Sequence, residues 1–258
     1  MKLKGTVAVV TGASSGIGKA IALAFAREGA HIVLADCNPM TFEVTAGEIR
    51  SLGRKPLTVV TDVAREAQVK VMVEQTVETF GRIDILVNNA GIAGPTANLI
   101  DLSLVDWDNV MMINLTGPML CSREVLRFMI PQHNGNIINI SSVAAKLAMP
   151  MRSPYCASKL GLLGLTQSLA LEVGKYNIRV NAICPGSVTG GRMERVWQER
   201  AAATGTTYEE QVQEEKSVSP LGRLITGEDV AKTAVFLASD ECSETGQVLN
   251  VSVGVAMH

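Results

Sequence analysis

Residues 6–18 read TVAVVTGASSGIG, a strand pattern that runs directly into a glycine-rich turn. The residues before the turn are mostly apolar and β-branched, which is typical of a parallel strand covered on both faces. A helical pattern with Ile21, Leu23 and Phe25 follows the turn. A strand, a glycine-rich turn and a helix together direct backbone N–H groups and the positive end of a helix dipole at a phosphate. The stretch therefore predicts an α/β fold with a phosphate-binding turn.

The same turn allows two other interpretations. A P-loop would use Gly18 and Lys19, but that motif also requires a glycine and a serine or threonine where the chain has Ala13 and Ala20. The P-loop interpretation therefore fails. A purely structural glycine turn is the second alternative, and the turn by itself does not exclude it.

A carboxylate follows the second strand pattern. Residues 31–35 are apolar except at their start, and Asp36 stands at their carboxyl end, 18 residues after Gly18. Dinucleotide-binding folds place an acidic residue about 20 residues after the glycine turn, where it accepts a hydrogen bond from the adenosine ribose 2′-hydroxyl. Such a carboxylate repels a 2′-phosphate, and the neighbouring Ser15 and Cys37 offer no cation to neutralise one. The sequence therefore favours NAD over NADP as the cofactor.

Strand and helix patterns alternate to the end of the chain. The further strand patterns cover residues 57–61, 83–87, 136–140, 178–184 and 247–251. Right-handed crossovers then give one parallel sheet of about seven strands with helices on both faces, the doubly wound Rossmann-type fold. We expect residues 1–258 to form a single domain that binds the dinucleotide and performs the catalysis. Residues 192–216 have a helical composition broken at Gly205, so we expect two helices that form a substrate lid at about residues 190–220.

Composition and charge exclude several classes of protein. The hydrophobic content is 47% and the charged content 19%, which is typical of a packed globular protein. The net charge is −2 without a basic stripe, so no nucleic-acid partner is expected. The sequence contains no apolar run of about 18 residues, so no membrane partner is expected. The five scattered cysteines and the absence of a signal peptide predict reduced thiols and a cytoplasmic location, and we expect no metal site.

A tyrosine and a lysine open the helical pattern after residue 154. Tyr155 and Lys159 are four residues apart, so they share one face of a helix. The ammonium favours the phenolate and therefore lowers the pKa of the tyrosine. A tyrosine of this kind can exchange a proton with an alcohol or a carbonyl group. The alternative is an ordinary surface pair at helical spacing.

Polar residues or helix breakers mark three further positions. Asp62 follows the third strand pattern and could cap the helix at residues 66–80 or contact the adenine, and both can hold. Asn88 and Asn89 follow the fourth strand pattern and can hydrogen-bond the backbone of neighbouring loops. Pro118 interrupts a long helical pattern and predicts a kink or a first helical turn there.

In order and spacing, these residues resemble the short-chain dehydrogenase/reductase family, and the resemblance covers nearly the whole chain. The ordered set carries more weight than the glycine turn alone. The matching motifs are Thr11-Gly12-x-x-x-Gly16-x-Gly18, Asn88-Asn89-Ala90-Gly91, Asn114, Ser142 thirteen residues before Tyr155, Tyr155-x-x-x-Lys159, and Pro185-Gly186.

The resemblance implies a role for each motif. Tyr155 would be the general acid/base, Lys159 would lower its pKa and hold the nicotinamide ribose, and Ser142 would hydrogen-bond the reacting oxygen. Asn114 would position a water that links Lys159 to solvent. A homotetramer is the family expectation, with the helices from Leu115 and Tyr155 in one interface. The implied cofactor-binding residues are Gly12, Ser15, Gly16, Ile17, Gly18, Asp36, Asp62, Val63, Asn89, Ala90, Gly91, Tyr155, Lys159, Pro185, Gly186 and Val188.

The chain departs from the family pattern near its C-terminus. Members often end with Thr-Gly, an apolar strand and Asp-Gly-Gly. Here Thr245 and Gly246 are present, but Val251-Ser252-Val253-Gly254 replaces the end of the motif. The departure leaves the catalytic set intact and puts in doubt the packing of the last strand.

The substrate pocket is expected between the loops after Gly91 and Ser142 and the lid. Apart from two arginines and the polar pair Ser142 and Tyr155, its candidate residues are apolar. Arg152 or Arg192 could bind an anionic substrate group, because a guanidinium suits carboxylate, phosphate or sulfonate. The alternatives are an arginine that faces solvent or one that pairs with a glutamate of the lid. The candidates are Ser142, Met149, Arg152, Tyr155 and Arg192, with Ile92, Ala93, Met151, Met193 and Trp197 in the walls.

The sequence predicts an NAD-dependent oxidoreductase that acts on a secondary alcohol or its ketone, with a polyol, sugar-derived compound or hydroxy acid as the small-molecule substrate. One alternative is a 3-oxoacyl thioester reductase that uses NADPH. The other is a non-enzymatic NAD sensor, which would have no need of the proton-transfer residues Asn114, Ser142, Tyr155 and Lys159.

Overall fold

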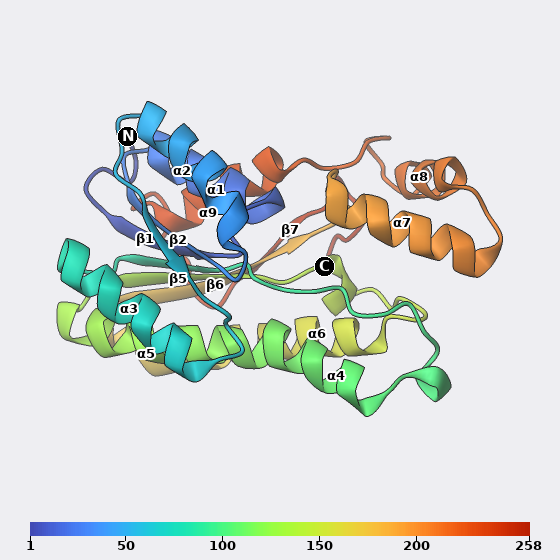
Figure 1. Cartoon of the computed structure of the whole chain (residues 1–258), viewed down its shortest axis with the longest axis horizontal. Coiled ribbons are helices and arrows are strands. Elements are labelled where there is room, and N and C mark those ends of the chain that lie inside the picture. Colours follow the sequence, from blue (N-terminus) through green and yellow to red (C-terminus); the bar gives the residue numbers. More distant parts are fainter.

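The protein folds around one parallel sheet in a computed structural model (Figure 1). The structure describes residues 1–190 and 193–258, and gives residues 191 and 192 only as part of a helix. Over this part of the chain the sheet has seven strands in the order β3-β2-β1-β4-β5-β6-β7, and every neighbouring pair is parallel. The predicted doubly wound parallel sheet is therefore confirmed. The strands are β1 (Val7–Thr11), β2 (His31–Asp36), β3 (Leu57–Val60), β4 (Ile85–Asn88), β5 (Gly135–Ile140), β6 (Ile178–Pro185) and β7 (Val248–Val251).

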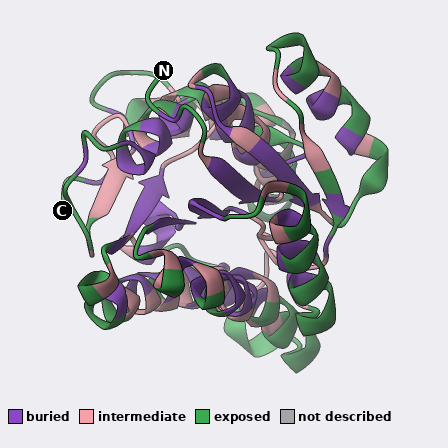
Figure 2. Cartoon of the chain, turned by 90° about the vertical axis from the view of Figure 1, so that its left-hand side faces the viewer, coloured by how far each residue is buried: buried purple, intermediate pink, exposed green. Residues whose placement is uncertain are grey.

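Helices cover both faces of the sheet (Figure 1). One layer contains α1 (Gly16–Arg27), α2 (Phe42–Ser51) and α9 (Gly227–Ala238). The other contains α3 (Glu66–Phe80), α4 (Leu104–Met111), α5 (Gly117–Gln132) and α6 (Ser153–Val173). Strand β1 shows why both layers form, because Val10 packs in the first hydrophobic cluster and Val9 in the second. The strands in the centre of the molecule are accordingly buried on both sides (Figure 2).

The strand order reverses beside β1, which pairs with β2 on one side and with β4 on the other. A crevice forms at the carboxyl ends of the strands at such a reversal, and ligands of doubly wound sheets bind there. The two helices predicted after the sixth strand are present as α7 (Gly191–Thr204) and α8 (Tyr208–Ser217), separated by Gly205 at a φ of 71°. They form a lobe beside the carboxyl ends of the strands (Figure 1).

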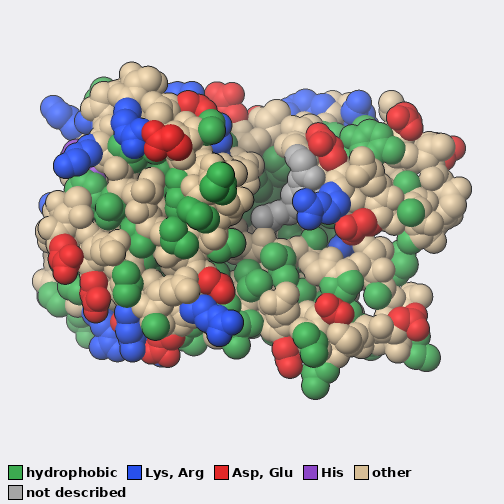
Figure 3. All heavy atoms as spheres, in the orientation of Figure 1, with side chains coloured by type: hydrophobic (Ala, Val, Ile, Leu, Met, Phe, Trp, Pro, Cys, Tyr) green, Lys and Arg blue, Asp and Glu red, His purple; other side chains and the backbone are tan. Residues whose placement is uncertain are grey.

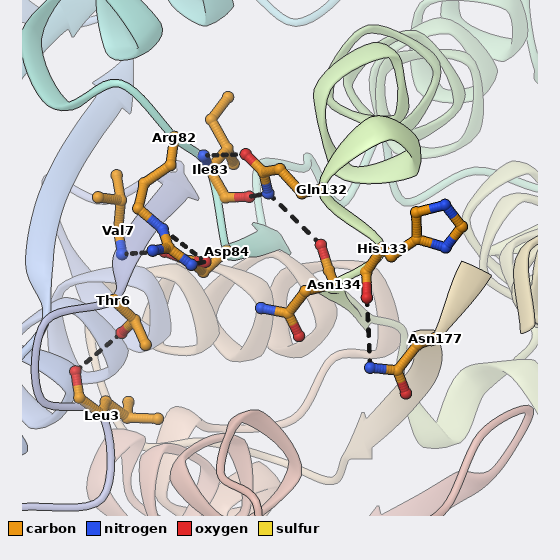
Figure 4. A network of polar contacts seen from close by, with 10 residues as sticks. All are labelled: Leu3, Thr6, Val7, Arg82, Ile83, Asp84, Gln132, His133, Asn134 and Asn177. Atoms are coloured by element: carbon orange, nitrogen blue, oxygen red, sulfur yellow. Dashed lines mark hydrogen bonds and ion pairs between the residues drawn. The ribbon is translucent and has the colours of Figure 1, made fainter.

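A polar network joins several elements at the amino-terminal ends of the strands, opposite the crevice (Figure 4). The carboxylate of Asp84 is 3% exposed, and it accepts hydrogen bonds from the backbone N–H of Val7 at 2.8 Å and from Nε of Arg82 at 2.9 Å. The hydrogen bond and charge of Asp84 raise the pKa of Arg82. The Gln132 side chain accepts from the N–H of Ile83 at 3.3 Å and donates to its carbonyl at 2.8 Å. The network joins the starts of β1 and β4 to the end of α5.

Replacing Asp84 tests this network. An Asp84→Ala protein should lose about 2–3 kcal/mol of unfolding free energy, because it leaves the buried N–H of Val7 without an acceptor and Arg82 without its partner. Urea denaturation measures the loss. The control is Glu43→Ala, which removes the exposed ion pair with Arg50 and should leave the unfolding free energy almost unchanged. Equal losses in the two variants would contradict a structural role for the network.

Candidate active site

The glycine-rich turn has the backbone geometry that only glycine adopts without strain. Gly12 and Gly16 lie in the left-handed region, at φ values of 62° and 54°. A Cβ atom on Gly18 would collide with the carbonyl of Gly12 and the side-chain amide of Asn89. The first turn of α1 therefore packs directly against the end of β1, which places the N-terminus of the helix at the crevice.

The turn has room and polar groups for a phosphate. Ser15 is the N-cap of α1, it is exposed, and its side chain makes no capping hydrogen bond. The hydroxyl of Ser14 is buried and has no hydrogen-bond partner among the described residues. A Cβ at Gly16 would meet nothing within 4 Å. The turn and the helix N-terminus therefore fit the pyrophosphate of a dinucleotide.

The carboxylate of Asp36 is held in place at the end of β2. One oxygen accepts a hydrogen bond from the backbone N–H of Ser14 at 3.1 Å, and the other accepts from the N–H of Asn38 at 3.1 Å. Burial, with a contribution from Asp36, raises the pKa of the adjacent Cys37 thiol. The carboxylate is thus fixed beside the glycine-rich turn, as the predicted contact to an adenosine ribose requires.

The structure corrects one interpretation of Asp62. The N-cap of α3 is Arg65, so the prediction that Asp62 caps this helix is wrong. Asp62 instead accepts a hydrogen bond from the N–H of Ala64 at 3.0 Å, which closes a local turn. The neighbouring Val63 is 5% exposed and lies against Gly117 at the start of α5.

The paired asparagines hold loops of the crevice together, as predicted. The Asn89 amide donates to the carbonyls of Thr11 at 2.9 Å and Gly12 at 3.1 Å. In the opposite direction, the Thr11 hydroxyl accepts hydrogen bonds from the N–H groups of Asn89 and Ala90, each at 3.0 Å. The Asn88 amide donates to Asn139 on β5 at 2.9 Å. These bonds fix residues 88–91 against the end of β1.

Asn114 lies in a π-helical turn, Met112–Thr116, between α4 and α5. Its side chain is fully buried; Oδ1 accepts from the N–H of Ile92 at 2.8 Å, and Nδ2 donates to the carbonyl of Ile92 at 2.9 Å and to Ser158 at 3.2 Å. The predicted break at Pro118 falls in the first turn of α5. Single π-helical turns are frequent at functional sites. This one joins the loop after β4 to the helix that carries Tyr155.

Tyr155 and Lys159 lie on the first turns of α6. Lys159 is 5% exposed; its Nζ lies 5.8 Å from the centre of the Tyr155 ring and donates to the carbonyl of Ile140 at 2.8 Å. The carbonyl at the end of β5 therefore holds the ammonium near the face of the tyrosine ring. Ser142, which follows the same strand, is 9% exposed and accepts from the N–H of Ala144 at 3.1 Å.

A cavity of about 330 Å³ opens at this edge of the sheet, and Ser142 and Tyr155 both line it. Figure 3 shows this face of the molecule hollowed between the main body and the lobe of α7 and α8. The volume suits a small organic ligand. Of the wall residues expected from the sequence, the cavity is lined by Ala93, Met149, Met151, Arg152, Met193 and Trp197. Ile92 is not among its lining residues, and Arg192 lies outside the described residues.

Arg152 is the N-cap residue of α6 and is only 8% exposed, so the expectation of a solvent-facing arginine is wrong at this position. Its Nη1 donates to the carbonyl of Gly94 at 3.1 Å. The alternative of a pair with a lid glutamate is confirmed for Glu199 on α7, whose carboxylate forms an ion pair with Nη2 at 3.9 Å, beyond hydrogen-bond distance. Burial lowers the pKa of Arg152, and the charge of Glu199 acts in the opposite direction.

The C-terminal segment forms a wall that sequence reasoning did not place at the site. Strand β7 pairs with β6, and the N–H of Gly186 donates to the carbonyl of Val251 at 2.9 Å. Ser252 and Val253 then line the cavity. Val253 lies in the left-handed region at a φ of 50°, which is unusual for a β-branched residue. The departure from the expected motif was the available signal, and it falls on the cavity wall.

The remaining predicted cofactor residues lie around the same edge. Pro185 is the last residue of β6, and Val188 forms an isolated bridge with Ile225. A Cβ on Gly91 would lie 3.0 Å from Oδ1 of Asn114 and 3.6 Å from Nζ of Lys159. Glycine at this position therefore lets the loop after β4 approach Asn114 and Lys159. Ile17 follows in the first turn of α1.

The described residues also bear on other kinds of site. The five cysteines are free, and burial raises the pKa of Cys121 to about 12. Among the helices described, none is long and apolar enough to cross a membrane. Within the same residues, no group of three or more His, Cys, Asp or Glu side chains is placed to hold a metal ion.

Known proteins similar to this chain match it over nearly its full length. A family model described as enoyl-(acyl carrier protein) reductase matches residues 12–256. A 3-oxoacyl-(acyl-carrier-protein) reductase of Thermotoga maritima is 40% identical over 258 residues, which are all of both chains. A (2S)-[(R)-hydroxy(phenyl)methyl]succinyl-CoA dehydrogenase subunit of Thauera aromatica is 39% identical, over 98% of both chains. The crystal structure of an NAD⁺-bound xylitol dehydrogenase has a TM-score of 0.95 and 35% identity, over 98% of this chain and 100% of that one.

Proposed function

Since the chain belongs to the short-chain dehydrogenase/reductase family of nicotinamide-dependent oxidoreductases, we propose that it transfers a hydride between NAD and a secondary alcohol or its ketone. The observation that carries the proposal is the position of Ser142 and Tyr155 in one cavity wall, with Lys159 beneath the tyrosine. A polyol, a sugar-derived compound or a hydroxy acid is the proposed substrate.

The side chains divide the work of the reaction. The nicotinamide ring, when bound, supplies or accepts the hydride. Tyr155 exchanges the proton with the substrate oxygen, and the ammonium of Lys159 stabilises its phenolate. Ser142 donates a hydrogen bond to the same oxygen. Asn114 holds the loop after β4 against α6 through Ile92 and Ser158, which keeps the catalytic helix in place.

The proposed cofactor is NAD because of Asp36. Its carboxylate is fixed by two backbone N–H groups, so it cannot easily turn away from a 2′-phosphate. The family resemblance adds further cofactor contacts from Gly12, Ile17, Val63 and Val188. Two similar crystal structures contain NAD, that of an NAD⁺-bound xylitol dehydrogenase and that of a Mycobacterium avium carveol dehydrogenase in complex with NAD.

An Asp36→Ala variant tests the cofactor proposal. The ratio of kcat/KM with NAD to kcat/KM with NADP should fall about 30-fold, because the variant loses a charge-assisted hydrogen bond to the ribose and the repulsion of a 2′-phosphate. Initial rates with each cofactor at one substrate concentration give the ratio. An unchanged ratio in a variant that unfolds at the parental temperature would remove Asp36 as the determinant.

A second candidate function is a 3-oxoacyl thioester reductase that uses NADPH. It is favoured by the 40% identity to a reductase of that description. One assay separates the two candidates: NADH formation is followed with polyols, hydroxy acids and secondary alcohols, and NADPH oxidation is followed with an acetoacetyl thioester. Faster turnover of the thioester with NADPH would replace the first proposal. Tight NAD binding without turnover in either arm would favour the sensor.

The proposal includes a tetramer, a lid and a location. Leu160 and Leu171 on α6 are 58% and 87% exposed, which suits a subunit interface on this helix. Light scattering measures the mass in solution, and a mass other than that of four subunits would show that the tetramer is wrong.

We also propose that α7 and α8 act as a lid on one domain that spans the chain. The enzyme is further proposed to work in the cytoplasm, where its free thiols stay reduced.

A further inference from the structure

A buried guanidinium lies at the wall of the cavity. Arg152 is 8% exposed, and among the described residues its Nη2 has no hydrogen-bond partner. The bond from Nη1 to Gly94 satisfies only part of the five-donor fork, and the Glu199 carboxylate at 3.9 Å is beyond hydrogen-bond distance. Leaving a buried charge so incompletely paired is costly. A bound anion that accepts hydrogen bonds from the remaining donors of Arg152 would offset this free-energy cost.

The position of Arg152 indicates where such an anion would come from. Arg152 precedes Tyr155 by three residues, so the two side chains are neighbours at the start of α6. Both line the same cavity. A single molecule in the cavity could therefore place an anionic group on Arg152 and a nearby oxygen on Tyr155.

The partner that Arg152 has in this structure is replaceable. Glu199 belongs to α7, its side chain is 44% exposed, and it accepts a hydrogen bond from Thr96 at 3.3 Å. It can turn to solvent when a better-placed anion enters. The other arginines that line the cavity in the described part of the chain are already paired, since Arg200 lies 3.5 Å from Glu215 and Arg223 lies 3.0 Å from Asp229.

We infer that Arg152 is a specificity-determining residue that binds an anionic group of the substrate, a carboxylate, phosphate or sulfonate, close to the carbinol carbon. The inference rests on the proposed function for the identity of the reacting group. A planar guanidinium can give such a group two parallel hydrogen bonds. Among the proposed substrates, it selects hydroxy acids and phosphorylated or sulfonated alcohols over neutral polyols.

Binding of ketone pairs tests the inference without requiring turnover. Calorimetry on the protein with NADH would compare acetoacetate with acetoacetamide, dihydroxyacetone phosphate with dihydroxyacetone, and 2-oxopropane-1-sulfonate with its methyl sulfone. In at least one pair, the unsubstituted protein should bind the anion about 30-fold more tightly than its neutral analogue. Arg152→Ala should abolish this preference and change the affinity for the neutral analogue by less than about threefold. The pair with the largest preference identifies the anion.

Three variants separate recognition from structural support. Arg152→Lys keeps the charge without the planar fork and should retain part of the preference. Glu199→Gln removes the competing carboxylate and should tighten anion binding about threefold, a gain that damage to the fold would not produce. Arg195→Ala, on the exposed side of α7, is the matched control and should leave the preference unchanged.

The outcomes distinguish this inference from the proposed function. Equal affinities within every pair, no binding of any anion, or an undiminished preference in Arg152→Ala would overturn the role of Arg152. An anion preference that depends on Arg152, together with no oxidation or reduction of any compound tested, would support the binding role and count against the proposed reaction.

Discussion

A Tyr155→Phe protein is expected to lose about 1,000-fold or more in kcat and to keep its affinity for NAD within about threefold. General acid–base catalysis contributes about 10²–10⁴-fold, and phenylalanine keeps the ring but cannot exchange a proton. The ring shape matters because Nζ of Lys159 lies 5.8 Å from its centre. Steady-state rates on the best alcohol of the screen, with calorimetry for NAD, measure the two quantities.

Tyr176→Phe is the matched control for this variant. Tyr176 follows α6, and its ring contacts His133 with 5.9 Å between the ring centres, at the opposite end of the helix from Tyr155. Removing this hydroxyl should change kcat by less than about twofold, as expected for a surface substitution. If Tyr155→Phe kept a tenth of the parental kcat, Tyr155 would not be the proton donor and acceptor.

The second large effect is expected from a single methyl group. Gly18→Ala should raise the Kd for NAD about 100-fold or more, because its Cβ would collide with the carbonyl of Gly12 and force the turn away from α1. The turn carries the N–H groups proposed to hold the pyrophosphate. NAD titration followed by calorimetry gives the Kd, and circular dichroism checks that the helices remain.

Gly47→Ala is the same substitution where space is available. Gly47 lies within α2, and a Cβ there meets nothing within 4 Å. This variant should gain about 0.5–1 kcal/mol of stability from the better helix propensity of alanine and bind NAD as the parent does. Parental NAD affinity in Gly18→Ala would show that NAD binding does not depend on the close packing of this turn, and the proposal that the turn holds the pyrophosphate would be wrong.

The sheet could be predicted from the sequence because its determinants are local. Apolar β-branched runs marked every strand to within about two residues, and Gly205 marked the end of α7. The fourth strand shows the limit of the method, since the pattern began at Ile83 but pairing begins at Ile85. Asp84 uses its side chain to bind the N–H of Val7, a contact that depends on a residue far away in the sequence.

The parts of the site that escaped prediction depend on packing between distant segments. The burial of Arg152 depends on the carbonyl of Gly94 and on the approach of Glu199 on α7. The π-helical turn around Asn114 leaves no signal in residue type beyond the nearby Pro118. Val253 reached the cavity wall through the pairing of β7 with β6, which the motif departure could flag but not position.

The cavity lined by Ser142 and Tyr155 also has a consequence for the evolution of this protein. As far as the structure describes them, its walls come from segments outside the sheet: residues 93–96, 142–155, 186–224 and 252–255. The glycine-rich turn and Asp36 belong to a different part of the chain. Mutations in the wall segments can therefore change the shape of the cavity without altering the glycine-rich turn or Asp36. A directed-evolution library confined to the four wall segments, with Ser142, Tyr155, Gly186 and Val188 held constant, should yield mostly folded proteins with new substrate ranges.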